Sequence, residues 1–246
     1  GSNNSQSNMI MNELLSTFSG PVGFIITAVQ VMVVSTSYSN ETNPKTRARY
    51  SKFSQANIDD VSTTWPSKIA MMVIYTPAFL TSMTLLILGL YVRPIPTIIP
   101  LPSLANALGA IHMGKRCLEV LFLHKYSGRT DRGTPMMIST FYTLSTTLVA
   151  FAAGGRNNHG ATLTMITIGT AMFAIGIAGN FYHHYLLAAL RSSSSSRGND
   201  AKKYAAPRGG LFSYVATPHY LFELIGWLGI AIVSNHLNVY LSVAGM

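Results

Sequence analysis

Long apolar segments constrain this chain more than any other feature of its sequence. A membrane-spanning helix needs roughly 20 mainly apolar residues. Segments of that kind fall at about 20–38, 69–92, 103–124, 134–153 and 161–190, with a further region at about 211–246. The last region is long enough for one span and the start of another. We therefore expect an all-α fold, a polytopic membrane helical bundle of six to seven spans.

The composition agrees with a protein that lies in lipid. Charged residues make up 10% of the chain and hydrophobic residues 48%, whereas a soluble domain has about 25% charged residues. The single cysteine, Cys117, can form no internal disulfide, and nothing in the sequence implies a metal. We expect residues 1–19, which carry no Lys or Arg, to form a lumenal tail and residues 20–246 to form one transmembrane domain.

The net charge of +9 raises the question of a nucleic-acid partner. The basic residues lie between apolar segments and form no surface of interleaved aromatic and basic side chains, so we expect no nucleic acid. The first, third and fifth loops hold five, three and five Lys or Arg residues, and the second and fourth hold one each. This alternation predicts that the first, third and fifth loops are cytosolic, and phosphate-bearing ligands are a further reason for basic residues.

Only two acidic residues, Glu119 and Glu223, lie within apolar segments. Ionisable side chains inside a membrane are costly and usually face the bundle interior or a wet cavity. We therefore expect the functional site to surround these two carboxylates.

The third segment places His112, Lys115, Arg116 and Glu119 at spacings i, i+3, i+4 and i+7, on one helical face. One interpretation is internal charge pairing, in which Glu119 neutralises Lys115 or Arg116 and the face only holds helices together. The other is that one cation is left to meet a ligand anion or a developing oxyanion.

The fifth segment carries Asn180, His184 and Arg191 on one face toward the predicted cytosolic end. An interfacial belt with a snorkelling Arg191 is the simpler interpretation. A groove for a phosphate-bearing cofactor is favoured, because Arg suits phosphate and Asn suits an amide or a ribose.

The sixth region opens with Pro207, Arg208, Gly209 and Gly210, where the glycines would let backbone N–H groups approach an anion. A turn of this kind before a span is also commonplace. His219, Tyr220 and Glu223 follow within one helical turn of each other. Tyr220 is either a proton donor or an ordinary interfacial aromatic residue.

Several nucleotide and catalytic motifs are absent from the sequence. It contains no GxGxxG after a strand, no P-loop, no HExxH, no CxxC and no GxSxG. A nucleotide cofactor would therefore have to bind inside the helical bundle.

Three segments occur in an order that resembles the steroid 5α-reductase family, which includes very-long-chain enoyl-CoA reductases and polyprenol reductases. They are HMGKRCLEVLFLHKYSG, GNFYHHYLLAALR and PRGGLFSYVATPHYLFELIGW. In addition, WPSKIAMMVIYTPAF resembles the second span of the plant-type members. The resemblance covers roughly residues 50 to 240 and is closest over 103–246.

The resemblance implies a multi-span enzyme of the endoplasmic reticulum that uses NADPH to reduce a lipid carbon–carbon double bond conjugated to a carbonyl. Hydride goes to the β carbon and a proton to the α carbon of a 4-ene-3-oxo steroid or a 2-enoyl-CoA. The family's NADPH contacts match Asn180 and Arg191, with His184 where many members have Asp. Its Pro-Asn-Tyr motif is Pro218-His219-Tyr220 here, and Glu223 matches its cofactor-side glutamate.

The resemblance also bears on the substrate end of the site. The Lys-Arg pair of the enoyl reductases matches Lys115 and Arg116, and their catalytic tyrosine best matches Tyr220. Steroid reductases grip the 3-keto group with a Glu and a Tyr, and the aligned positions here are Tyr75 and Met113. This difference favours an enoyl-reductase-like use of Lys115, Arg116 and Tyr220. Family members usually continue beyond LSVAGM into a basic cytosolic tail, so the resemblance implies a C-terminal truncation.

Two alternatives stay open from the sequence. The first is a membrane methyltransferase of the isoprenylcysteine type that binds S-adenosylmethionine, although the order Pro218-His219 differs from the Arg-His-Pro of those enzymes. The second is a non-catalytic sterol-binding membrane protein, which the residues Tyr75 and Met113 would favour. The oligomeric state is left undetermined.

Overall fold

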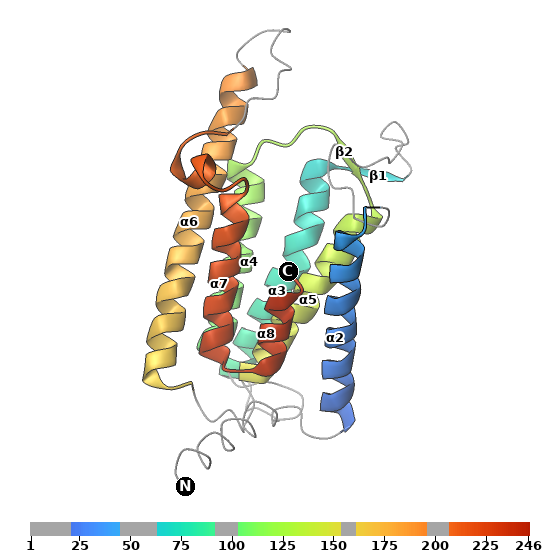
Figure 1. Cartoon of the computed structure of the whole chain (residues 1–246), viewed down its shortest axis with the longest axis vertical. Helices are drawn as coiled ribbons and strands as arrows, with labels where there is room; N and C mark the ends of the chain where they lie inside the picture. The colour runs from blue at the N-terminus through green and yellow to red at the C-terminus, as the bar shows by residue number, and fades with distance from the viewer. Residues whose placement is uncertain (1–20, 45–62, 92–102, 154–160, 196–206) are drawn as a thin grey trace.

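The computed structural model of the protein is a bundle of helices with one small two-stranded antiparallel sheet (Figure 1). It describes residues 21–44, 63–91, 103–153, 161–195 and 207–246. The helices are α2 (Pro21–Thr42), α3 (Ser67–Tyr91), α4 (Leu104–Leu118), α5 (Gly133–Ala153), α6 (Leu163–Ser195), α7 (Pro218–Ser234) and α8 (Leu237–Ala244). The short elements are the strands β1 (Thr64–Pro66) and β2 (Arg129–Asp131), the π-helical turn η2 (Glu119–Leu123) and the 3-10 turn η4 (Gly210–Ser213). The mainly helical architecture is confirmed, and the predicted tail at 1–19 lies outside the described residues.

Three described helices are long and apolar enough to cross a membrane, namely Ser67–Tyr91, Gly133–Ala153 and Leu163–Arg191. The third predicted segment divides into the 15-residue α4 and the turn η2, and α7 has only 17 residues. The number of six to seven spans therefore stays a prediction. At 33 residues, α6 is about 50 Å long against a hydrocarbon core of about 30 Å, and it projects beyond the other helices (Figure 1).

The ends of the helices around the site have clear local causes. The Ser103 side chain accepts the Asn106 backbone N–H at the start of α4, and Pro218 begins α7 where a missing N–H costs little. Asn235 ends α7 in the left-handed conformation, with φ 49°. At the end of α4 the His124 N–H donates to the Glu119 carbonyl at 2.8 Å, which closes the π-turn.

The two-stranded sheet joins the beginnings of α3 and α5 at one end of the bundle. Trp65 of β1 lies opposite Thr130 of the antiparallel strand β2. The Arg129 guanidinium donates to the Thr64 hydroxyl at 2.8 Å and to the Thr64 carbonyl at 2.9 Å. Because both strands lead directly into helices, this contact fixes how α3 and α5 start.

The N-terminal helix α2 contacts the C-terminal helix α8 through a cluster of amides and hydroxyls. The Gln30 amide donates to the Asn238 carbonyl at 3.0 Å and to the Ser242 hydroxyl at 3.1 Å, and the Asn238 amide donates to the Thr27 hydroxyl at 3.0 Å. These amide and hydroxyl contacts join two helices from opposite ends of the described chain.

Helices α6 and α7 approach each other closely because glycines face glycines along their contact. A Cβ on Gly176 would lie 2.7 Å from the Phe222 carbonyl oxygen and closer still to the Gly226 backbone. One turn further along α7, a Cβ on Gly229 would lie 2.5 Å from the Gly169 carbonyl oxygen. The side chains that α6 and α7 present to the site depend on this spacing.

We predict that Gly176→Ala destabilises the protein, since its methyl group would have to push α7 away from α6. Overpacking of this kind costs about 1–3 kcal/mol. The measurement is the midpoint of thermal unfolding in one detergent or nanodisc. The control is Gly109→Ala in α4, whose Cβ would meet only the Ser82 hydroxyl at 3.9 Å. A midpoint for Gly176→Ala equal to or above that of Gly109→Ala would contradict the prediction.

Candidate active site

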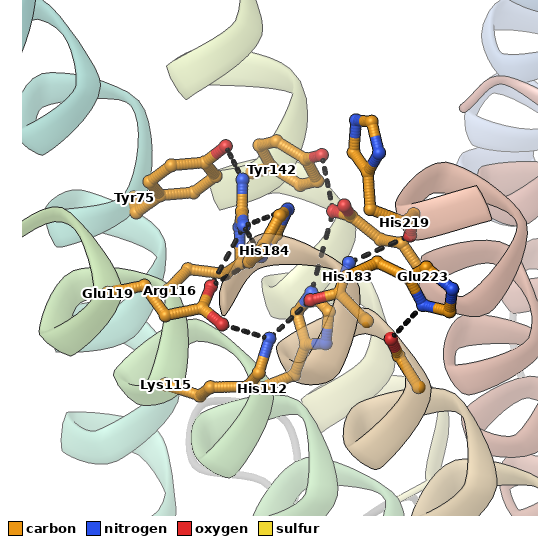
Figure 2. Close-up of polar contacts among 12 residues, drawn as sticks. Tyr75, His112, Lys115, Arg116, Glu119, Tyr142, His183, His184, His219 and Glu223 are labelled. Carbon is orange, nitrogen blue, oxygen red and sulfur yellow. Dashed lines mark hydrogen bonds and ion pairs between the residues drawn. The ribbon is translucent and has the colours of Figure 1, made fainter. Parts of the chain in front are cut away.

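The two carboxylates expected to mark the site both lie inside the bundle. Glu119 is 3% exposed and Glu223 is 7% exposed. Figure 2 shows the polar residues that surround them, which come from α3, α4, α5, α6 and α7. We call these residues the buried cluster, and they are Tyr75, His112, Lys115, Arg116, Glu119, Tyr142, Asn180, His184, His219 and Glu223.

Glu119 is the acceptor at the centre of one half of the buried cluster. Lys115 Nζ lies 2.7 Å from its Oε1, and Arg116 Nη1 lies 2.9 Å from its Oε2. The His184 ring nitrogen Nδ1 lies 3.0 Å from Oε2. The predicted face of α4 is therefore confirmed for these residues, and both cations contact Glu119. The expected charge pairing is therefore present. Because one carboxylate cannot neutralise both Lys115 and Arg116, a net positive charge remains around Glu119.

Arg116 contacts side chains of three elements, namely Glu119, His184 and Tyr75 (Figure 2). Besides Glu119, its Nη1 lies 2.9 Å from His184 Nδ1, and its Nη2 donates to the Tyr75 hydroxyl. The guanidinium also lies 4.5 Å from the centre of the Tyr75 ring. Because Tyr75 accepts from Arg116, its own hydroxyl hydrogen is available to another acceptor.

Glu223 is the acceptor in the other half of the buried cluster. The Tyr142 hydroxyl donates to Glu223 Oε1 at 3.1 Å, and His112 Nε2 lies 3.6 Å from the same oxygen. The His112 ring packs on Trp227, with 5.1 Å between ring centres. His112 thus contacts Glu223 and not Glu119. Its spacing from Glu119 along the helix did not predict this partner.

Asn180 joins the two helices that carry the rest of the site. Its side-chain oxygen accepts from Lys115 Nζ, and its amide nitrogen donates to the His219 carbonyl at 2.8 Å. The predicted face of α6 thus brings Asn180 and His184 to Lys115 and Glu119. His219 and Glu223 are one turn apart on α7, yet the His219 ring lies beside His184, at 5.4 Å between ring centres, and not on Glu223.

The remaining predicted cofactor residues lie outside the buried cluster. Arg191 is exposed and its Nη1 donates to the Lys125 carbonyl at 2.9 Å. Arg208 and Gly209 are also exposed, and Gly209 has a φ of 89°, a conformation that favours glycine. Arg191 lies near the C-terminal end of α6, and Arg208 and Gly209 directly precede η4, which contacts α6 through the Leu211–His183 hydrogen bond.

The structure places the tyrosines differently from the sequence analysis. Tyr220, the predicted proton donor, is 61% exposed and packs its ring on His219 at 4.3 Å. Tyr75 and Tyr142 are the tyrosines whose hydroxyls enter the buried cluster. Tyr142 was missed because it sits in an apolar segment with no ionisable neighbour, whereas Tyr75 was noted only as a difference from steroid reductases.

One group of described side chains has the composition of a metal site. Ligand atoms of Glu119, His124 and His184 lie within 4.8 Å of one another. However, Lys115 and Arg116 already contact the same carboxylate. Two cations beside Glu119 repel a divalent ion, so these residues suit a polar organic ligand better than a metal.

Comparison with known proteins finds similarity to the second half of the chain. The family model for 3-oxo-5-alpha-steroid 4-dehydrogenase matches residues 135–242. A very-long-chain enoyl-CoA reductase of Dictyostelium discoideum is 26% identical over 137 residues, which is 54% of this chain and 42% of that protein. An uncharacterized protein of Schizosaccharomyces pombe is 30% identical over 132 residues, 53% of this chain and 44% of that protein.

Each match thus covers less than half the length of the relative. The family match begins after α4, so it includes Asn180, His184 and Glu223 but not Lys115, Arg116 or Glu119. Residues 135–242, which match the model of the 3-oxo-5-alpha-steroid 4-dehydrogenase family, supply one side of the buried cluster.

Proposed function

We propose that this protein is a reductase of the endoplasmic reticulum membrane that uses NADPH to saturate a lipid carbon–carbon double bond conjugated to a carbonyl. The substrate is a 2-enoyl-CoA or a 4-ene-3-oxo steroid. The observation that carries the proposal is the contact of Lys115, Arg116 and His184 with the Glu119 carboxylate inside an apolar bundle. The family domain and the relative named as an enoyl-CoA reductase support the same class of reaction.

The described residues fit a nicotinamide dinucleotide. Arg116 Nε and His219 Nδ1 are buried and have no hydrogen-bond partner in the part of the chain that the structure describes. Buried polar atoms of this kind favour a ligand that completes their hydrogen bonds. Asn180, His184, His219 and Glu223 would hold the inner, uncharged part of the cofactor.

The exposed end of the site fits the charged part of the same cofactor. Arg191 and Arg208 would pair with its phosphates, because a guanidinium binds phosphate with two parallel hydrogen bonds. Gly209, which has no side chain and a positive φ, would let the backbone come close to a phosphate. When bound, NADPH supplies the hydride for the β carbon of the substrate.

Addition of hydride moves negative charge onto the carbonyl oxygen of the substrate. Arg116 and Lys115 are the donors for that oxygen, and Glu119 holds both in place. The Tyr75 hydroxyl, which Arg116 orients, is a further donor on the same side. Tyr220 would then give its proton to the α carbon, the carbonyl re-forms, and the saturated product leaves.

The first test is NADPH oxidation by the purified protein in nanodiscs. We expect consumption with a 2-enoyl-CoA or with a 4-ene-3-oxo steroid, and one saturated product per NADPH by mass spectrometry. S-adenosylmethionine serves as the comparison cofactor, since its binding would favour a methyltransferase. Absence of NADPH consumption with both substrate classes would count against the proposal.

We predict that Tyr220→Phe lowers kcat by about a hundredfold, the usual effect of removing a general acid, and changes the Kd for NADPH little. Steady-state turnover and cofactor titration measure the two quantities. The control is Tyr91→Phe, an exposed tyrosine at the end of α3. Unchanged turnover would remove Tyr220 from the mechanism and leave Tyr75 as the phenol to test next.

Arg191→Ala should mainly weaken binding of NADPH. Loss of a charge-assisted hydrogen bond costs about 1.5–3 kcal/mol, which is about ten- to a hundredfold in Kd. The matched control is Arg132→Ala, an exposed arginine directly after β2 whose guanidinium lies 5.6 Å from the Trp65 ring. Equal NADPH affinity in the two variants would exclude a role of Arg191 in the cofactor site.

A further inference from the structure

His183 fastens the segment before α7 to α6. We call this segment, residues 207–217, the strap. The backbone N–H of Leu211 in the strap donates to His183 Nε2 at 3.0 Å, and His183 Nδ1 lies 2.7 Å from the Gly179 carbonyl oxygen. A carbonyl oxygen only accepts, so Nδ1 carries the ring hydrogen and Nε2 is the acceptor. Both nitrogens of a neutral imidazole are therefore used.

The His183 ring is also packed between three elements. It stacks on Phe222 of α7 at 5.2 Å between ring centres, with 21° between the planes, and meets the edge of Phe212 of the strap at 5.5 Å. Tyr182 meets it from its own helix at 5.2 Å. With 2% exposure, the side chain joins α6, the strap and α7 at one point.

The strap lies so close to His183 that only glycine fits at the contact. A Cβ on Gly210 would lie 2.7 Å from His183 Nε2, and Gly210 has a φ of 52°. The Phe212 N–H donates back to the Gly209 carbonyl at 3.2 Å. The position of Gly209, and of Arg208 before it, is thus set by the bond between His183 and Leu211.

The adjacent histidines His183 and His184 of α6 contact different parts of the protein. His184 enters the buried cluster and contacts Glu119, whereas His183 accepts the Leu211 N–H of the strap. Asn180 adds a second tie, from its amide to the His219 carbonyl at the start of α7. These two ties hold the strap and the first turn of α7 against α6.

We infer that His183 is a positioning residue for the cofactor: by accepting the Leu211 N–H, it holds Arg208, Gly209 and His219 where they bind NADPH. The inference rests on the proposed function, since it assumes that the strap contacts this cofactor. It assigns His183 no contact with the reacting atoms. A change at His183 should therefore alter the affinity for NADPH and leave turnover at saturating cofactor nearly unchanged.

Two substitutions separate the hydrogen bonds of His183. In His183→Gln the amide oxygen reaches about as far as Nε2 and can still accept from Leu211. In His183→Asn the amide nitrogen replaces Nδ1 and can still donate to Gly179, but the side chain is too short for Leu211. We expect an NADPH Kd near wild type for His183→Gln and about tenfold higher for His183→Asn, with similar kcat in both.

A measurement without cofactor tests the strap itself. Hydrogen exchange at the amides of residues 211–215 should be slow in wild type and in His183→Gln, and faster in His183→Asn. If wild type binds NADPH and His183→Asn binds it equally well, the positioning role is wrong while the proposed function stands. If wild type does not bind NADPH, the proposed function falls, and with it the role in cofactor binding.

A second pair of variants covers the case in which His183→Asn does not fold. Gly210→Ala pushes the strap off His183 from the other side and should also raise the NADPH Kd. The control is Gly128→Ala, which has a φ of 83° as well but nothing within 4 Å of the added Cβ. Equal NADPH affinity in these two variants would overturn the inference.

Discussion

The contact between Arg116 and Glu119 is the interaction on which the rest of the site depends. An ion pair buried among apolar helices is stable only when the remaining donors and acceptors also find partners. Glu119 meets this requirement with Lys115 and His184, and Arg116 meets it with Tyr75. These partners come from α3, α4 and α6, so satisfying one ion pair fixes three helices. Removing either member would leave a charge uncompensated inside the bundle.

The sequence predicted the contacts that a single helix determines. Lys115, Arg116 and Glu119 are three or four residues apart, and the helical period alone brings such residues together, as the structure confirms. Asn180 and His184 share a face of α6 for the same reason, and both reach the side chains of α4. An apolar surrounding made these few polar residues easy to recognise.

Contacts between helices could not be predicted in this way. His112 meets Glu223 and not Glu119, and Tyr142 was not expected in the site at all. Which side chains face each other across α4, α5 and α7 depends on helix rotation and separation, and these are set by apolar packing and by the glycine contacts of α6 with α7. Spacing along one helix carries no information about either quantity. The π-turn at Glu119 was hidden for a related reason, since EVLFL reads as ordinary helix.

The helix α6 orders the chemistry of the proposed reaction along its length. Asn180 and His184 lie in the bundle, where a low dielectric strengthens their hydrogen bonds to the uncharged part of the proposed cofactor. Arg191 follows two turns later, about 10 Å along the axis, where its charge is exposed and costs little to maintain. His183, adjacent to His184 on this helix, holds the strap against α6. One helix can therefore bind an uncharged reactive group in the apolar interior and phosphates outside it, which is what a reduction of lipid by a soluble dinucleotide requires.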